Sequence, residues 1–461
     1  MRHFVSEKNR FKPSEVRSPE KLSLRRFFLR YPIFLLALGP PIFRSGAGID
    51  ATKGVIDFWA VLQVAWIGLI AIRAMKRLAF AQSILIPKQV RSILRLLFIL
   101  GFLFVASAEY SPGRLVSAAY AILYLLTVIC MAEFIADTYK NPIDWMQVIF
   151  HFRTIFFLLF ILVIITIFFD PGIVLYVLPG VGIRLVGGTV APVAVICPFM
   201  AIISSYAFLF SLESKTRSVF FFVVGLLGTL SVQSRGGMLA LLTSLALIGI
   251  IWAGTGKRNS YLFIASSFAS VILAGVVLAV VGGGRVWNTF NRGQSLEGIQ
   301  SASGRTDVWK FVIHYCLAHP LGMGYVAGFR MIFQKYFVLG LQLEVAHVGN
   351  THNSFIDALA AAGWPALTVY LFLLVKIFLL GWRYSRKQAI FSSASEDITR
   401  HVLCCTMALL VFCMVCGMDA SDFAIPMRAA FYFQNLIIAM ILGMSARLLA
   451  ASRARAIEPV A

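Results

Sequence analysis

Charged residues are scarce in this chain. Asp, Glu, Lys and Arg make up 13% of its 461 residues, whereas hydrophobic residues make up 59%. An ordinary soluble domain carries about 25% charged residues, so this composition excludes the soluble globular class. The apolar residues recur in runs of about 20, which is the length that a membrane-spanning helix needs. The sequence therefore predicts an all-α polytopic membrane protein, a bundle of transmembrane helices.

Acidic residues are scarcer still. The chain has 20 Asp and Glu against 41 Lys and Arg, which gives a formal net charge of +21. A basic excess also marks nucleic-acid-binding proteins, where Lys and Arg form a patch or stripe. Here they gather in short segments between apolar runs, as the positive-inside rule describes for membrane proteins. We therefore expect membrane lipids as partners and no nucleic acid.

Cysteine gives no sign of a disulfide framework. Cys316 is the single cysteine of the long polar segment, and the other cysteines fall in apolar runs, where Cys behaves as a small hydrophobe. Cys413 and Cys416 form a C-x-x-C pair inside a predicted helix, without a thioredoxin-like context. Residues 1–30 are basic and polar, with no early apolar core before a small-residue cleavage site. We expect neither a disulfide nor a cleaved signal peptide.

Twelve apolar segments are candidate spans, and the first is the weakest because Pro40, Pro41 and Arg44 interrupt it. Their expected bounds are 31–47, 55–74, 92–109, 114–137, 144–169, 190–212, 217–234, 237–253, 260–281, 356–380, 400–417 and 428–449. The chain is thus divided into a basic tail at 1–30, nine spans in 31–281, a loop at 282–355, three spans in 356–449 and a second tail at 450–461.

Basic residues predict the orientation of these spans. Both tails and every second short loop are rich in Lys and Arg, whereas the intervening loops are poor in them. The positive-inside rule then places both termini in the cytoplasm and the 282–355 loop on the opposite face. In a Gram-negative cell, that face of the inner membrane is the periplasm.

The loop is the one long polar segment, from Gly282 to Ser354. A loop of this length is functional or disordered, and its Gly, Trp, Arg and His content argues against disorder. Thr306 to Leu317 is predicted as an unusually apolar helix that lies in the membrane interface or packs on the bundle. His319-Pro320 ends it. Leu321 to Gly324 is predicted as a flexible turn, and Phe329 to Leu339 as a second short helix.

Three arginines near the loop side of the membrane are candidate anion-binding residues. Arg184 and Arg235 break the positive-inside trend, and ionisable residues at membrane depth are functional candidates. Arg305 directly precedes the predicted loop helix, where helix N–H groups and a guanidinium together favour phosphate. The alternatives are that Arg184 and Arg235 reach lipid head groups or cap helices, and that Arg305 forms a salt bridge with Asp307.

His352 is the candidate base. It stands between Thr351 and Asn353, directly before the tenth span. An imidazole there can accept a proton near neutral pH when a neighbouring amide or hydroxyl orients it. The alternative is a hydrogen-bonded structural histidine. Asn353 and Asp307 are the expected supporting residues.

A metal site is a competing interpretation of the same segment. Glu344, His347 and His352 offer the ligand types of catalytic zinc, but their spacing matches no compact motif such as HExxH. Asp419 and Asp422 lie in a predicted turn on the same side. They could bind a metal or hold an arginine, and we favour the second role.

Four motifs in order resemble the O-antigen ligase and polysaccharide polymerase superfamily. They are SVQSRGG (Ser231–Gly237), SGRTDVW (Ser303–Trp309), HPLGMGY (His319–Tyr325) and THNSFIDALAAAGWPAL (Thr351–Leu367), with RLVGGT (Arg184–Thr189) as a weaker fifth. One departure is GGTVAPVAV at 187–195, where many relatives carry Asn after the Pro. The first four spans match only in hydropathy.

The resemblance implies an inner-membrane glycosyltransferase with a large periplasmic loop. Such enzymes transfer glycan from an undecaprenyl-diphosphate-linked oligosaccharide to an acceptor hydroxyl, of lipid A-core in ligases or of a second lipid-linked repeat in polymerases. Arg184, Arg235 and Arg305 would hold the diphosphate, and His352 would activate the acceptor. No metal or other cofactor is implied.

We therefore predict a metal-independent, inverting transferase of O-antigen or exopolysaccharide biosynthesis, with a polymerase favoured over a ligase. No convincing carboxylate pair for a retaining mechanism is present. The alternative is a multi-pass transporter or flippase of lipid-linked or anionic substrates. Transporters commonly show internal repeats with broken helices, and the sequence shows no such symmetry.

Overall fold

The computed structural model describes residues 58–80, 86–140, 145–178, 182–185, 192–232, 234–253, 305–333, 335, 351–385, 394–418 and 429–457. The predicted spans 31–47 and 260–281 lie outside these residues. Glu344, His347, Asp419 and Asp422 also lie outside them. The metal set and the role of the two aspartates therefore remain predictions.

Long helices cover the other ten predicted spans. They are α3 (Phe58–Phe80), α4 (Lys88–Ser107), α5 (Arg114–Lys140), α6 (Trp145–Phe169), α8 (Val193–Leu209), α9 (Lys215–Val232), α10 (Arg235–Ala253), α16 (Ser354–Ser385), α17 (Ala394–Cys416) and α18 (Ala429–Ile457). Over the described residues, seven are long and apolar enough to cross a membrane, namely α4, α5, α6, α9, α16, α17 and α18, and α8 and α10 are shorter apolar helices. The all-α polytopic class is confirmed, and the total of twelve spans remains a prediction.

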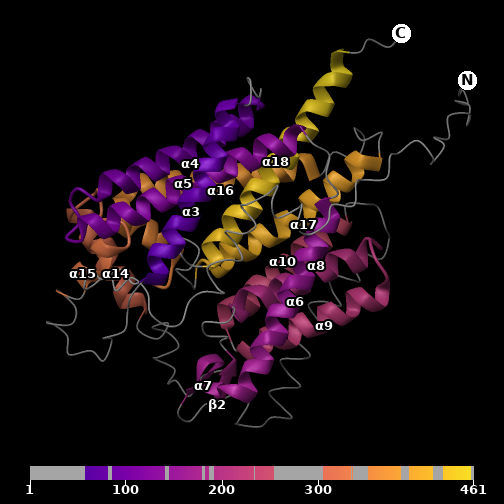
Figure 1. The fold of residues 1–461 in the computed structure, drawn as a ribbon, viewed down its shortest axis with the longest axis horizontal. Helices are drawn as coiled ribbons and strands as arrows, with labels where there is room; N and C mark the ends of the chain where they lie inside the picture. The colour runs from indigo at the N-terminus through magenta and orange to yellow at the C-terminus, as the bar shows by residue number, and fades with distance from the viewer. Residues whose placement is uncertain are drawn as a thin grey trace, which may run out of the picture.

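The helices form two groups joined by a central pair. α3, α4, α5 and α16 pack together on one side, and α6, α8, α9 and α10 on the other (Figure 1). α17 and α18 lie between the groups, because α17 contacts α10 and α16 while α18 contacts α5 and α17. This arrangement brings segments far apart in sequence into one bundle.

Small residues allow the closest helix pair to form. A Cβ on Gly225 of α9 would lie 2.7 Å from the Cys197 carbonyl oxygen and from the Ala201 nitrogen of α8. The two backbones therefore meet without an intervening side chain. Membrane helices gain much of their association energy from close packing of this kind, since lipid gives no hydrophobic drive between them.

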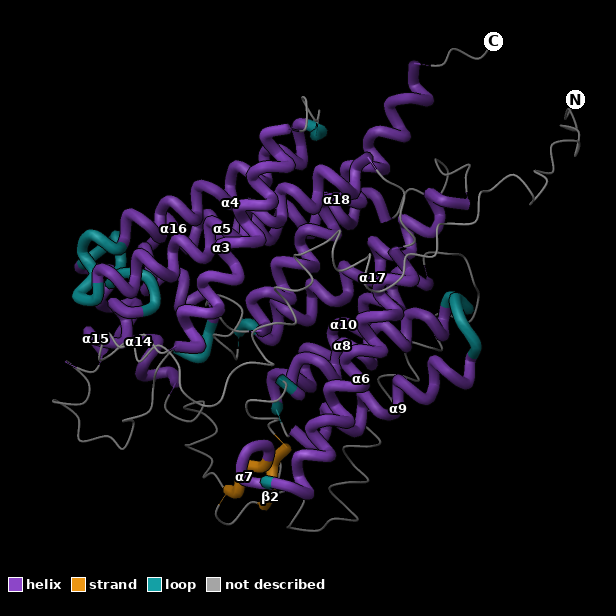
Figure 2. The backbone as a smooth tube through the Cα atoms, viewed as in Figure 1, coloured by secondary structure: helices purple, strands orange, loops and turns teal. Residues whose placement is uncertain are grey.

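A two-stranded hairpin is the one β element among the described residues. After the short helix α7 (Pro171–Val174), β1 (Leu175–Leu178) pairs antiparallel with β2 (Gly182–Leu185), and Tyr176 lies opposite Arg184. The sequence predicted no strands here. The hairpin and α7 lie together at one end of α6 (Figure 2).

Two more helices pack on the bundle outside the spans. α14 (Arg305–Ala318) and α15 (Ala327–Phe333) lie beside the end where α16 begins (Figure 1). α4 ends and α5 begins at the same place, since Tyr325 N donates to Ser107 Oγ at 3.1 Å and Ser117 Oγ donates to Tyr325 O at 2.7 Å. We call this the loop end of the bundle. The predicted loop helix is confirmed as α14, and the second one is shorter over the described residues than predicted.

α16 is broken near the loop end. Ala362 and Gly363 have non-helical backbone angles, and Gly363 has a φ of 70°. Broken helices are tolerated in membrane proteins where other groups satisfy the freed backbone N–H and C=O. Here residues 319–325 supply those groups.

The HPLGMGY turn is built into this break. Met323 N donates to Ala360 O at 2.7 Å, and Gly324 N donates to Ala361 O at 3.1 Å. In return, Trp364 N donates to Pro320 O at 3.1 Å. The sequence correctly predicted a turn, but its prediction of flexibility was wrong for residues 322–324, which are buried and hydrogen-bonded.

Gly363→Ala is expected to destabilise the protein by about 2–6 kcal/mol, because a side chain at positive φ is strained and the new methyl overpacks the turn. Its Cβ would lie 1.8 Å from Pro320 O. The measurement is thermal unfolding of the purified protein in detergent. Gly68→Ala is the matched control, since nothing lies within 4 Å of its Cβ position. Equal unfolding temperatures for the two variants would contradict the stabilising role of the turn packed against Gly363.

The one fully buried arginine of the described residues belongs to the opposite end. Arg153 of α6 is 0% exposed and makes a two-pronged ion pair with Glu213, in which Arg153 Nη2 donates to Oε2 at 2.7 Å. Ser218 Oγ also donates to this carboxylate, at 2.8 Å. A buried charge in a membrane protein is a functional candidate by default, but this pair with its further hydrogen bond explains Arg153 structurally.

Candidate functional site

The segment before α16 is held in an uncommon conformation. His352 is half-buried and has a φ of 54°, whereas Thr351 on one side is fully buried. A non-glycine residue at positive φ is uncommon, although His, Asn and Asp are enriched there. Such strain persists only where the surroundings fix it, and it concentrates at functional sites. Three sets of contacts fix it here.

The first set joins Thr351 to Asp357, one turn into α16. Thr351 Oγ1 donates to Asp357 Oδ1 at 2.7 Å, and Thr351 N donates to the same oxygen at 3.2 Å. A hydrogen bond to a carboxylate is stronger than one between neutral groups. Asp357 therefore fixes the backbone on the amino side of His352.

The second set involves Asn353. Its Oδ1 accepts from Phe355 N at 2.9 Å and from Ile356 N at 3.1 Å, so Asn353 caps the first turn of α16. Its Nδ2 donates to Met418 O at 3.1 Å, just past the end of α17. Ser354 N donates to Gly417 O at 2.7 Å. The carboxyl side of His352 is thereby tied to two transmembrane helices.

The third set comes from the loop helix. Trp309 Nε1 of α14 donates to Thr351 O at 2.9 Å. Val308, Val312 and Cys316, on one face of α14, are buried in a cluster with residues of α15 and α16. Of the two predicted positions for this helix, packing on the bundle is confirmed. The contact brings the SGRTDVW and THNSF motifs together.

Arg305 is the first residue of α14 and is half-buried. It lies one turn before Trp309, at the amino end of the helix, where the helix dipole gives a partial positive charge. Asp307, its predicted salt-bridge partner, has Oδ1 3.8 Å from Lys310 Nζ. Arg305 and His352 are thus on two segments that the Trp309 bond connects.

Arg235 and Arg184 are placed by their backbones. Arg235 is the first residue of α10, where Ser234 Oγ accepts from Gly237 N at 3.2 Å. α10 packs along α17, whose carboxyl end bonds to Asn353 and Ser354. Arg184 is on β2, which contacts α9. β2 contacts α9, α9 contacts α10, and α10 contacts α17, so Arg184 is linked to the His352 segment indirectly, through three successive helices.

Other histidines of the loop are less suited to a site. His314 and His319 are exposed, and the His319 ring lies 4.5 Å from that of Tyr315. Neither is held by a network comparable to that around His352. Among the described residues, no group of three His, Cys, Asp or Glu side chains is placed to hold a metal.

Tyr325 is a buried structural residue rather than a base. Its ring stacks on Phe104 with centroids 4.1 Å apart. Burial raises the pKa of the Tyr325 hydroxyl well above its ordinary value, and the nearby Tyr124 adds to the rise. The hydroxyl therefore stays protonated at physiological pH.

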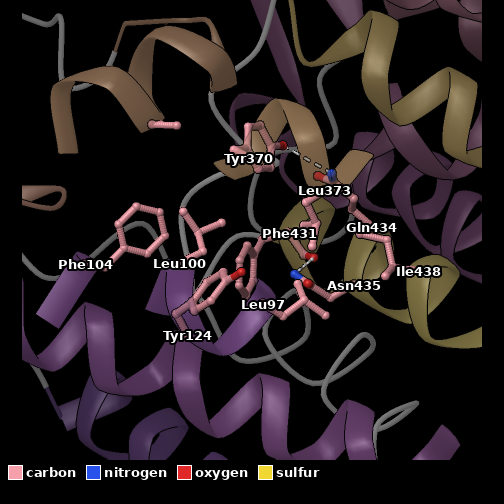
Figure 3. A pocket seen from close by; sticks show the side chains of 11 residues that line it. Leu97, Leu100, Phe104, Tyr124, Tyr370, Leu373, Phe431, Gln434, Asn435 and Ile438 are labelled. Atoms are coloured by element: carbon pink, nitrogen blue, oxygen red, sulfur yellow. Dashed lines mark hydrogen bonds between the residues drawn. The ribbon is translucent and has the colours of Figure 1, made fainter. Parts of the chain in front are cut away.

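A small pocket lies deeper in the bundle, between α4, α5, α16 and α18 (Figure 3). It is lined mainly by Leu, Ile and aromatic side chains, and Gln434 Nε2 donates there to Tyr370 OH at 3.2 Å. Its free volume of about 20 Å³ suits about one water molecule. The pocket is too small for a sugar, so the candidate site is the His352 segment at the loop end.

Sequence reasoning named Thr351 as a neighbour of His352 but did not identify Trp309 and Asp357 as members of this network. Asp357 had one detectable signal, an acidic residue in the first turn of a helix that Asn353 precedes. Trp309 had none, because its partner is 42 residues away in the sequence.

Fold and site together define a multi-pass membrane protein with a helical loop docked on one end of its bundle. Residues 219–371 match a family model described as O-antigen ligase. The match includes Arg235, Arg305 and His352, and it confirms the predicted resemblance to the O-antigen ligase and polysaccharide polymerase superfamily. No curated protein matches the chain. Arg184 lies outside the matched residues.

Proposed function

We propose that this protein is a metal-independent, inverting glycosyltransferase of the bacterial inner membrane. It transfers glycan from an undecaprenyl-diphosphate-linked oligosaccharide to an acceptor hydroxyl on the periplasmic face. The observation that carries this proposal is the fixed left-handed conformation of His352, which lies within the matched residues and is held by contacts with α14, α16 and the end of α17.

The chemistry needs one base and a stabilised leaving group. The acceptor oxygen attacks the anomeric carbon, the bond from that carbon to the diphosphate oxygen breaks, and the acceptor proton passes to His352. The departing diphosphate keeps the bonding electron pair and gains charge, which Arg184, Arg235 and Arg305 stabilise. Fixed cationic donors aimed at developing charge are among the largest contributions to catalysis. A single displacement of this kind inverts the anomeric configuration.

Asp357 serves as a positioning residue in this proposal, because it holds the backbone of Thr351 beside the base. Asp357→Ala is expected to lower kcat about tenfold or more, since a hydrogen bond to a charged group contributes about 1.5–3 kcal/mol. Asp357→Asn retains an oxygen that accepts both bonds and is expected to restore most of the rate. The measurement is kcat and KM for the lipid-linked donor. Equal rates for the two variants, or a change in KM alone, would argue against a positioning role.

Between the two subtypes, we propose the polymerase, with the ligase as the close alternative. Glycan analysis of a strain lacking the protein separates them. Single repeat units attached to the acceptor are expected after loss of a polymerase. Long polymer that stays on the lipid carrier would identify a ligase instead. Transfer activity that survives EDTA is expected in either case.

The competing function is transport or flipping of a lipid-linked substrate, which the number of spans and the basic residues would suit. Loss of a flippase leaves lipid-linked units on the cytoplasmic face, so neither extended nor transferred glycan appears. The network around His352 favours transfer, because a transport pathway does not require a histidine held in a strained conformation outside the spans.

A further inference from the structure

The exposed face of α14 changes character along its length. Lys310, His314 and Leu317 follow one another at intervals of four and three residues, so they share one face of the helix. Lys310 is charged and exposed, whereas Leu317 is 63% exposed and the following Leu321 is 59% exposed. Ile313 is also exposed on this side. The face is therefore polar near the start of α14 and apolar near its end.

The apolar end lies level with the start of the transmembrane segments. The Leu321 carbonyl accepts a hydrogen bond from Tyr110 OH, in the short connection between α4 and α5. The Cys316 carbonyl accepts from Trp364 Nε1 at 3.2 Å, just past the break in α16. Beyond the break, residues 365–385 extend about 30 Å at the rise of an α-helix, which is the thickness of the hydrocarbon core.

Tyr110 and Trp364 are aromatic residues of the kind found at membrane–water interfaces. Both are partly exposed, at 41% and 39%, and Tyr and Trp are enriched at the boundary between lipid and water. Leu115, the second residue of α5, follows Tyr110 by five residues and is 88% exposed. Leu317 and Leu321 thus continue the exposed apolar surface of this connection.

We propose that the end of α14 inserts into the surface of the bilayer through Leu317 and Leu321, while Lys310 remains in water. The occupant of this apolar face is lipid. Its continuity with the apolar spans and with Tyr110 and Trp364 argues for lipid, and the charge at Lys310 sets the upper limit of insertion. α14 is then a helix that packs on the bundle with one face and enters the membrane with one end.

This insertion sets the height of the candidate site above the lipid. Trp309, which bonds to the Thr351 carbonyl, precedes Leu317 by about two turns, or at most about 12 Å along the helix. His352 would then lie at the level of the lipid head groups. A carrier-bound diphosphate would lie at the same level, and this last step rests on the proposed function, whereas the insertion does not.

Spin labels on the full-length protein in liposomes test the insertion. Nitroxides attached to Leu317→Cys, Leu321→Cys and Lys310→Cys are compared by power saturation with oxygen, which concentrates in lipid, and with a water-soluble nickel chelate. The native cysteines are all buried, and burial raises the pKa of the Cys316 thiol to about 12, so background labelling is expected to be low. The readout does not depend on transfer activity.

The expected result is oxygen-dominated relaxation at 317 and 321 and nickel-dominated relaxation at 310. Nickel-dominated relaxation at 317 and 321 would overturn the proposal, since both positions would then face water. Low accessibility to both reagents, with dipolar coupling between labels on two copies, would also overturn it, because a second copy would cover the face instead of lipid.

Discussion

Replacing His352 with Asn is expected to lower the rate of glycan transfer by about 100- to 10,000-fold, the usual contribution of a positioned general base. Asn is the sharper substitution because it tolerates the left-handed conformation that His352 adopts at φ 54°. The backbone network is thus retained while the base is lost. The measurement is transfer per mole of purified protein with a lipid-linked donor.

His314→Asn is the matched control for this prediction. His314 is an exposed histidine on α14, and replacing it with Asn makes the same chemical change outside the proposed site. We expect it to retain full activity, and both variants are expected to keep the wild-type unfolding temperature. A His352→Asn variant with wild-type transfer would remove His352 from the chemistry.

Replacing Arg305 or Arg235 with Ala is expected to lower kcat/KM for the lipid-linked donor by about 100- to 1,000-fold each, the cost of removing one donor that stabilises developing charge. Both arginines lie at the first residue of a helix, α14 and α10, where the helix dipole adds to the field of the side chain. Lys in place of Arg keeps the charge but loses the paired donors. We therefore expect the Lys variants to fall between wild type and Ala.

Lys310→Ala provides the control for the arginine series. Lys310 lies on α14 five residues after Arg305, is exposed, and pairs with Asp307. Its removal changes the net charge of the loop helix by the same amount. If Lys310→Ala and Arg305→Ala reduced activity equally, a general electrostatic effect would explain the result better than a diphosphate site.

Much of the architecture was predictable from the sequence because a membrane-spanning helix needs a long apolar segment, which is a local feature of the chain. Apolar length located the ten described spans, and the apolar residues of 306–317 together with His319-Pro320 located α14. The arginines at helix starts were visible for a similar reason, since charge in an apolar chain stands out. His352 was singled out by its polar neighbours immediately before a span.

The parts that escaped prediction depend on contacts between distant segments. The HPLGMGY turn follows from local residues, but its insertion into α16 depends on backbone groups that only the break in that helix exposes. The bond from Trp309 to Thr351 and the brace from the end of α17 to Asn353 also join segments that are far apart. The hairpin around Arg184 was missed because short strands near a glycine-rich turn carry little periodic signal.

The most direct test of the central claim is glycan transfer by the purified protein in detergent, where no second compartment exists. We predict that lipid-linked donor is consumed, that the acceptor glycan grows with inverted anomeric configuration, and that undecaprenyl diphosphate is released in equal amount to the bonds formed. Absence of transfer, in a preparation that nevertheless moves lipid-linked oligosaccharide across liposome membranes, would contradict the transferase and establish the transporter.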